Sequence, residues 1–196
     1  MRVILASGSP RRSEILRELG FDFEIHKPEI DETRLANESP ENLCLRLSRL
    51  KAQSVARDFA NELVIAADTI VVIDCEILGK PKDKSDALRM LRKLQGREHE
   101  VMTGLSICES GKIISCVEHS FVKFRDLSDS EMRAYISTNE GDDKAGAYAV
   151  QGKGAFLIEQ VRGDFHNVVG LPIFRLGKML EKFGYDFAFC VTGGNL

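Results

Sequence analysis

The chain has 196 residues, of which 43% are hydrophobic and 29% are charged, with a formal net charge of −3 at pH 7. This length suits one sizeable domain or two small lobes, and the slight negative charge argues against a general nucleic-acid or anionic-membrane surface, which would need an excess of cations. Five cysteines without a CxxC spacing favour reduced, mostly buried thiols over a disulfide framework or a zinc site.

The N-terminal segment predicts a strand, a helix and a second strand. Residues 2–7, "RVILAS", form an apolar run typical of a buried strand. The run is too short for a signal peptide or a membrane span, which favours a cytoplasmic protein. A helix follows, with Ser9 suited to the N-cap and Pro10 to the first helical position. Residues 21–27 alternate in polarity and predict a strand, and an irregular acidic loop follows over residues 28–38.

The middle of the chain predicts a long helix, a very apolar strand and a second helix. Residues 39–60 form an amphipathic pattern that begins at the capping residue Ser39. The most apolar stretch, "LVIAADTIVVI" at 63–73, predicts a strand or a pair of strands interrupted by Asp68. Residues 79–96 predict a loop and then a helix that ends at a glycine.

The second half of the chain contains a hairpin, a capping box and a glycine-rich segment. Its glycine-rich part, residues 139–164, predicts little beyond one strand. The expected elements begin with a long hairpin over 99–125 that turns at 109–112 and a short helix that starts at "SDSE" (128–131) and runs through Tyr135. A strand near 156–161, a final helix after "GLP" (170–172) and a frayed tail at 190–196 follow.

Strands and helices interleave along the chain, which predicts an α/β fold: a mixed, twisted sheet with flanking helices. The order of elements suggests one domain over residues 1–196, in which a section at about 96–140 could form a smaller lobe. A cleft between two lobes would then be a natural ligand site.

Two arginines raise the first functional hypothesis. Arg11 and Arg12 stand in the first turn of the first predicted helix, where the helix dipole and the free N–H groups repel cations. Guanidinium groups make sense there if an anion is expected, because their planar forks grip phosphate oxygens in pairs. Ser7 and Ser9 add hydroxyl groups, so we predict a phosphate site. The alternative is that both arginines point into solvent or pair with acidic residues of the same helix.

Asp68 raises the second hypothesis, because it interrupts the most apolar stretch of the chain. Burying an unpaired carboxylate there would cost on the order of several kcal/mol. Such an acid needs a cation, a metal or a water that it activates, so Asp68 is a candidate general base or metal ligand. The alternative is a strand-end Asp that binds backbone N–H groups or a lysine. Glu32, in the acidic loop, could supply a second carboxylate for a hard metal such as Mg²⁺.

Several blocks, in this order along most of the chain, resemble the Maf family of nucleotide pyrophosphatases. That family is part of a wider fold group similar to inosine triphosphate pyrophosphatase. The matching blocks are "ASGSPRRSEIL" (6–16), "DE" (31–32), "KA" (51–52), "AADTIVV" (66–72), "GKP" (79–81), "GREHEVMTG" (96–104), "DKAGAYAVQGKG" (143–154) and "NVVGLP" (167–172).

The resemblance implies a cytosolic hydrolase that converts a nucleoside triphosphate to the monophosphate and pyrophosphate, with a divalent metal such as Mg²⁺ or Mn²⁺, and it suggests a homodimer. The family's catalytic proton acceptor maps onto Asp68, and Glu32 would complete the metal coordination. Positions that divide the family into branches fall on Arg12, Thr69 and Gln151. These residues look like the branch that cleaves dTTP and UTP, and the substrates could include modified pyrimidine nucleotides.

The chemistry of a nucleotide substrate agrees with these assignments. A triphosphate is strongly anionic, so Arg11, Arg12, Lys51 and Lys80 can offset its charge and that of the departing pyrophosphate. A thymine or uracil edge has carbonyl acceptors on either side of one N–H donor. The side-chain amide of Gln151 carries a donor and an acceptor, and it can complement part of that edge.

Two other functions stay open from the sequence alone. A non-catalytic nucleotide-binding regulator of cell division would keep the arginines and would not need Asp68. A phosphatase with an aspartyl-phosphate intermediate would trap phosphate on Asp68, but the D-x-D pattern is missing. For the pyrophosphatase we expect a small-molecule nucleotide as the partner, and neither a nucleic acid nor a membrane.

Overall fold

The computed structural model describes residues 2–193, whose β-strands form a mixed sheet. Within these residues the sheet has seven strands: six follow the order β2-β1-β3-β5-β6-β7, and β4 pairs with β3 outside this order. β1 pairs in parallel with β2 and β3, whereas the pairs β3–β4 and β6–β7 are antiparallel. The mixed α/β fold is therefore confirmed. The bounds are β1 Val3–Leu5, β2 Phe23–Ile25, β3 Leu63–Ile73, β4 Glu76–Leu78, β5 Glu98–Glu109, β6 Lys112–Phe124 and β7 Ile158–Gly163.

The helices are interspersed between these strands. None of those within residues 2–193 is both long enough and apolar enough to cross a bilayer. Their bounds are α1 Pro10–Glu18, α2 Pro40–Ala56, α3 Lys84–Leu94, α4 Asp129–Ile136, α5 Phe165–Val169, α6 Ile173–Glu181 and α7 Phe187–Val191, with short 3₁₀ turns η1 Ala145–Ala147 and η2 Gly152–Leu157.

The backbone divides into two compact units. The first unit comprises the chain up to Asp68, Thr103–Glu118 and the chain from Gly170 on, and the second comprises Thr69–Met102 and His119–Val169. The sequence suggested a smaller lobe at about 96–140. The second unit reaches beyond that range on both sides and leaves out residues 103–118, because long strands pass from one unit to the other along the chain.

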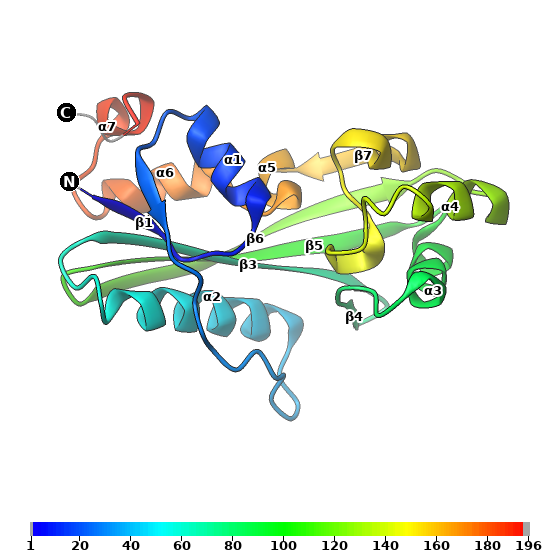
Figure 1. Cartoon of the computed structure of the whole chain (residues 1–196), viewed down its shortest axis with the longest axis horizontal. Coiled ribbons are helices and arrows are strands. Elements are labelled where there is room, and N and C mark those ends of the chain that lie inside the picture. The colour runs from blue at the N-terminus through cyan, green and yellow to red at the C-terminus, as the bar shows by residue number, and fades with distance from the viewer. Residues whose placement is uncertain (1, 194–196) are drawn as a thin grey trace. The chain divides into compact units, whose positions relative to one another are not determined.

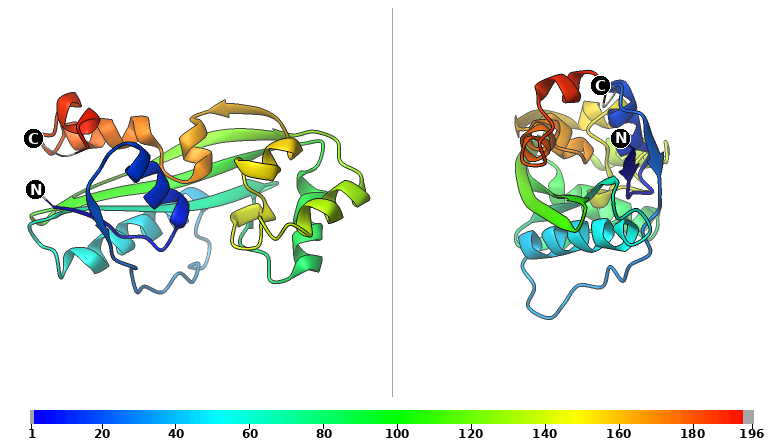
Figure 2. Two further views of the ribbon diagram at one scale, coloured as in Figure 1. Left: turned by 45° about the horizontal axis from the view of Figure 1, so that its top comes forward. Right: turned by 90° about the vertical axis from the view of Figure 1, so that its left-hand side faces the viewer.

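In the first unit, helices cover both faces of β1 and the start of β3. α2 lies on one face, and α1 and α6 lie on the other (Figure 1), as the end view in Figure 2 also shows. Ala52 and Val55 of α2 belong to the same apolar cluster as Ile4 and Val64 of the strands. Strands covered on both faces read as continuous apolar runs, which explains why this part of β3 shows no alternation.

In the second unit, α3 and α4 lie beside each other (Figure 1). Their apolar faces share a core with Phe124 of β6 and Tyr148 of the glycine-rich segment. The start of α4 has the expected capping box: the N–H of Glu131 donates to Ser128 Oγ, and the Glu131 carboxylate accepts from the Ser128 N–H. This local signal therefore placed the helix start correctly.

The structure decides two expected boundaries. β3 is one continuous strand, which confirms the first of the two alternatives for residues 63–73, and Asp68 does not divide it. The tail expected to fray from residue 190 instead includes the end of α7, because the Asp186 side chain caps this helix at the N–H of Phe189. Phe189 is buried against Phe21, with ring centroids 6.1 Å apart. The rest of that tail from residue 194 lies outside the described residues.

A buried histidine in the second unit makes stability depend on pH. His99 is 3% exposed, and its Nε2 lies 2.7 Å from the Tyr148 hydroxyl. Burial lowers the pKa of His99 from 6.5 to about 3, because the charged ring would lose its hydration. Between these two values the unfolded chain binds a proton that the folded chain does not bind. The free energy of unfolding should therefore fall as pH decreases from 6.5 to 3.

The variant His99→Gln should lose this part of the acid sensitivity, because glutamine does not titrate. Chemical denaturation at a series of pH values measures the effect as a smaller slope of unfolding free energy against pH. The same substitution at His26, whose side chain is 40% exposed, is the matched control and should keep the wild-type slope. Parallel curves for wild type and His99→Gln would contradict the prediction.

Candidate active site

A buried ion pair joins Lys51 of α2 to Asp68 of β3. Each residue is 8% exposed, and Lys51 Nζ lies 2.6 Å from Asp68 Oδ1. The same Nζ lies 2.8 Å from Oε1 of Glu32, whose side chain is 60% exposed. One ammonium group therefore contacts a buried and an exposed carboxylate. The sequence left open whether Asp68 binds backbone N–H groups or a lysine. The structure shows the bond to a lysine, which gives the buried acid the cation that it needs.

The helix pattern of α2 explains why this lysine is buried. Leu47 and Val55 lie four residues before and after Lys51, on the face of the helix that packs against the sheet, and both are buried. Residues at this spacing share one helix face, so the ammonium group is directed toward the strands. Lys51 therefore lies where its charge has a partner, whereas most lysines lie at the surface.

Arg12 of α1 is fixed by the backbone and does not simply extend into solvent. Its Nε donates to the carbonyl of Gly170 at 2.8 Å, and its Nη1 donates to Ser7 Oγ at 3.2 Å. Ser7 Oγ also accepts from the N–H of Ser9 at 3.1 Å. These bonds hold the guanidinium group of a half-buried side chain in one orientation.

Ser9 occupies the N-cap position of α1, as expected, but its side chain makes no capping hydrogen bond. The predicted N-cap position of Ser9 is therefore confirmed, and the hydroxyl of Ser7, rather than that of Ser9, accepts from the backbone at this turn. Short hydroxyl side chains often bind the backbone two residues further on, which competes with helix capping. The first-turn N–H groups of α1 consequently receive no bond from the Ser9 hydroxyl.

The charges of the first unit act on one another. The pKa of Arg12 is lowered to about 10: burial is the main cause and the positive charge of Arg11 adds to it, whereas the negative charges of Asp68 and Glu32 oppose it. Arg12 therefore stays charged at neutral pH. The structure brings the start of α1, the acidic loop and the buried acid of β3 into one electrostatic cluster, which we call the charged cluster: Arg11, Arg12, Glu32, Lys51 and Asp68.

The loop that carries Glu32 is held by Arg46, a residue that no sequence motif indicated. Arg46 of α2 donates from Nε and Nη2 to the two carboxylate oxygens of Glu38, at 2.6 and 2.8 Å. Arg46 Nη2 also donates to the carbonyl of Thr33 at 3.1 Å. The hydrogen bonds from Arg46 lower the pKa of Glu38 to about 2. The one sequence feature that could have indicated this contact is the presence of an arginine in the helix that follows an acidic loop.

The donor set fits a hard divalent cation. Asp68 and Glu32 converge on one cationic atom, Lys51 Nζ, so their oxygens reach a common position. Carboxylate oxygens are preferred ligands of Mg²⁺ and Mn²⁺, which commonly use one or two carboxylates and substrate phosphates. Within residues 2–193 no group of three or more His, Cys, Asp or Glu side chains is placed to hold a metal ion.

The other predicted site residues belong to the second unit. Thr69 follows Asp68 directly in β3 and is half-buried. Lys80 is exposed in the segment between β4 and α3, and Gln151 is exposed immediately before η2. The first unit therefore holds the predicted phosphate-binding and catalytic residues apart from Lys80, and the second unit holds the residue predicted to contact the base.

The fold is similar to that of a solved structure. The Ham1 protein of Staphylococcus aureus superimposes with a TM-score of 0.54 at 14% sequence identity, over 93% of this chain and 100% of that chain. At this identity the likeness shows the fold alone. It agrees with the fold group expected from the sequence blocks.

Sequence comparison identifies the family. Residues 2–183 match the family model described as Maf-like protein. A curated relative from Clostridioides difficile, named dTTP/UTP pyrophosphatase, is 53% identical over 93% of this chain and 95% of its own length. A relative of the same name from Dictyoglomus thermophilum is 46% identical, over 94% of this chain and 97% of its own length. The chain belongs to the Maf-like family.

Proposed function

We propose that this protein is a nucleoside triphosphate pyrophosphatase that hydrolyses dTTP and UTP to the nucleoside monophosphate and pyrophosphate. The observation that carries the proposal is the charged cluster, in which a buried acid, Asp68, shares one ammonium group with Glu32 and acts electrostatically on Arg12. The names of the two curated relatives support the choice of substrates. Modified pyrimidine triphosphates that keep the same base edge belong to the same substrate class.

The cations of the charged cluster bind the triphosphate. Arg12 is already oriented by Gly170 and Ser7, so little conformational freedom is lost when its guanidinium group meets phosphate oxygens. Ser9 is the N-cap residue of α1 and Arg11 lies in its first turn, where N–H groups favour an anion. Lys51 can direct its donors to phosphate oxygens when these oxygens approach, since an ammonium group carries three donors.

Asp68 is the proton acceptor of the reaction. A water oxygen attacks the α-phosphorus, the bond from that phosphorus to the bridging oxygen breaks, and the water proton passes to the Asp68 carboxylate. Pyrophosphate leaves with the electron pair of the broken bond. The positive charges of Arg11, Arg12 and Lys51 offset the charge that develops on the leaving group, as in other phosphoryl-transfer sites.

Glu32 and Asp68 are the residues that would hold a divalent cation, either Mg²⁺ or Mn²⁺. Such an ion neutralises charge on phosphate oxygens and makes a bound water more acidic. Glu32 is suited to this role because it is exposed and is attached to a loop fixed by Arg46. Lys51 would then give up part of its contact with the carboxylates and turn toward the phosphates.

The proposal also gives roles to three residues of the second unit. Gln151 recognises the pyrimidine edge through its amide, and Lys80 adds positive charge for the phosphates. Thr69 binds substrate from its position next to the catalytic acid. We further propose that the enzyme works in the cytoplasm on free nucleotides, as a homodimer, without a nucleic-acid or membrane partner. The chain lacks a cation excess, which supports the absence of such partners.

Product analysis tests the proposed function. Purified protein with dTTP or UTP and Mg²⁺ should release equal amounts of monophosphate and pyrophosphate, measured by ion-exchange chromatography. Tight nucleotide binding without turnover would favour the regulator of cell division. Release of orthophosphate, with phosphate trapped on Asp68, would favour the aspartyl-phosphate phosphatase.

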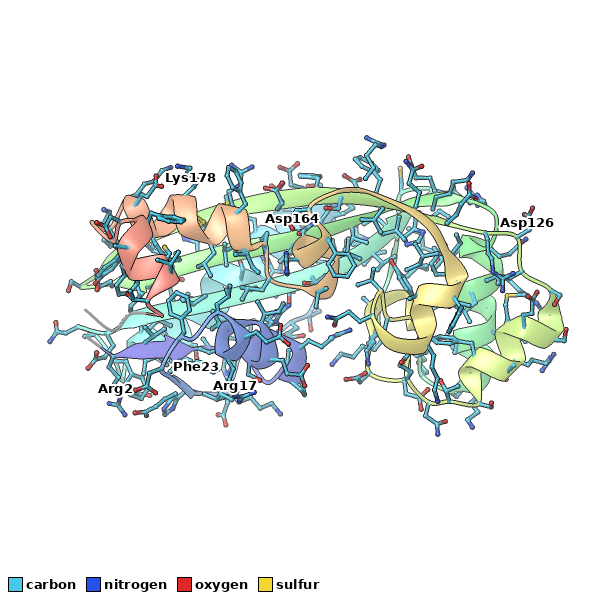
Figure 3. All side chains as sticks on the ribbon, turned by 90° about the horizontal axis from the view of Figure 1, so that it is seen from above. Arg2, Arg17, Phe23, Asp126, Asp164 and Lys178 are labelled. Atoms are coloured by element: carbon cyan, nitrogen blue, oxygen red, sulfur yellow. The ribbon has the colours of Figure 1, made fainter. Side chains whose placement is uncertain are left out.

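The variant Arg12→Lys should lower kcat/KM for dTTP by about 10- to 100-fold, because it keeps the charge but loses the planar fork and its bonds. Steady-state kinetics measure the effect. The control is Arg17→Lys on the same helix, for which no change is expected. The Arg17 guanidinium group lies over the Phe23 ring, 6.0 Å from its centroid, and Figure 3 labels both residues. An unchanged kcat/KM in Arg12→Lys would show that this arginine binds no phosphate.

A further inference from the structure

The exposed loop around Gln151 is held at both ends by side chains from one short segment. At its start, the N–H of Ala149 donates to the Tyr135 hydroxyl at 3.0 Å. At its end, Glu140 Oε1 accepts from the N–H of Lys153 at 2.9 Å, and Glu140 Oε2 accepts from the N–H of Gly154 at 2.8 Å. Gln151 lies between these attachments. We call Tyr135 and Glu140 the two-point clamp.

The loop backbone lies so close to the clamp that glycine is needed there. Gly152 has φ +63°, a conformation that favours glycine, and a Cβ added to it would lie 2.3 Å from Glu140 Oε1. A Cβ on Gly154 would lie 2.0 Å from the Ala149 carbonyl oxygen. The two glycines therefore allow the carboxylate to reach the backbone on one side of Gln151 and allow the loop to fold back on its own start.

The clamp residues are themselves fixed. Tyr135 is 6% exposed and belongs to the apolar core of the second unit. The N–H of Glu140 donates to Thr138 Oγ1 at 3.3 Å, and the carbonyl of Glu140 accepts from Lys144 Nζ at 2.5 Å. The exposed side-chain amide of Gln151 therefore belongs to a backbone segment that is fixed to a rigid part of the fold. A recognition group is kept in one geometry in this way.

We propose that Tyr135 and Glu140 are positioning residues that set base selectivity by holding the backbone of Gln151. This inference rests on the proposed function, in which the Gln151 amide recognises the pyrimidine edge. A site selects by hydrogen bonds only if its donor and acceptor are held where the correct base needs them, because a mobile amide adapts to the wrong base. Loosening the clamp therefore weakens recognition of the base and leaves the phosphate chemistry intact.

The test compares UTP with CTP, whose edge carries a donor where UTP carries an acceptor. In Glu140→Gln, the new NH₂ group faces a backbone N–H that it cannot bind. We expect the ratio of kcat/KM for UTP to that for CTP to fall by about 10-fold, the effect of losing one well-placed hydrogen bond. The change should come from a higher KM for UTP, with kcat within about twofold of wild type, because uniform binding affects KM alone.

Tyr135→Phe is the second variant, because it removes the acceptor for the Ala149 N–H and keeps the ring. It should shift the ratio in the same direction. The matched control is Glu159→Gln, the same substitution in the same unit at an exposed carboxylate paired with Lys123 at 2.8 Å, and it should leave the ratio unchanged. Thermal melts of all variants identify any loss of folding.

Amide hydrogen exchange gives a readout that does not depend on turnover. Exchange over residues 149–154 should be faster in Glu140→Gln than in wild type and in Glu159→Gln, because one backbone N–H loses its acceptor and the other keeps only a neutral amide oxygen. Faster exchange without a change in the UTP to CTP ratio would overturn the role in selectivity, and so would a fall in kcat alone. A wild-type protein that releases no pyrophosphate from UTP would instead contradict the proposed function itself.

Discussion

Replacing Asp68 by Asn should lower kcat for dTTP by about 10²- to 10⁴-fold, the usual contribution of a positioned general base. Asparagine keeps the size of the side chain and a carbonyl oxygen that can still accept from Lys51 Nζ, which lies 2.6 Å from Asp68 Oδ1 in the wild type. It cannot take a proton from the attacking water. The dissociation constant for dTTP should change by less than about tenfold, since Arg12 and Lys51 keep their charges.

Steady-state kinetics and isothermal titration separate the two effects. The matched control is Asp74→Asn, the same substitution at an exposed carboxylate that pairs with Arg97 in the second unit. That control should retain wild-type kcat. A near-normal kcat in Asp68→Asn would remove Asp68 from the mechanism, and a loss of binding equal to the loss of turnover would assign it to substrate binding.

Replacing Lys51 by Met should lower the free energy of unfolding by about 3–5 kcal/mol, because it leaves a buried carboxylate without its cation. Asp68 is 8% exposed and cannot recover its hydration, whereas Glu32 is exposed and returns to water. The double variant Lys51→Met/Asp68→Asn should regain much of this loss, since the buried charge is then absent. Both variants should be inactive.

Urea denaturation at neutral pH measures these differences as a double-mutant cycle. Lys93→Met is the control, because Lys93 pairs with Glu76 at the surface and its loss should change stability little. The account would be wrong if Lys51→Met unfolded at the wild-type urea concentration. It would also be wrong if removing the Asp68 charge gave no recovery in the double variant.

Elements with local signals were predictable from the sequence. The capping box of α4, the turn between β5 and β6 and the proline at the start of α2 each depend on neighbouring residues. β4 and α7 were missed because three- and five-residue elements depend on distant partners: β4 needs β3, and Phe189 of α7 needs Phe21. Short apolar stretches at such positions carry no periodicity to detect.

The residues of the candidate site could be predicted from the sequence, whereas the contacts between them could be predicted only in part. The misfit of Arg12 and Asp68 with their local surroundings pointed to them, as positions that break local rules often do. Lysines usually lie at the surface, so the sequence did not predict that Lys51 is buried. Its burial follows from the packing of α2 against the sheet. The Gly170 carbonyl that orients Arg12 is a backbone group, which residue types alone do not reveal.

The central claim is that the charged cluster directs water to the α-phosphorus, with Asp68 as the proton acceptor. Hydrolysis of dTTP in water enriched in ¹⁸O, followed by mass spectrometry of both products, tests it most directly. The account predicts that one ¹⁸O atom enters the thymidine monophosphate and none enters the pyrophosphate. Label in the pyrophosphate would mean attack at the β-phosphorus and would contradict the account.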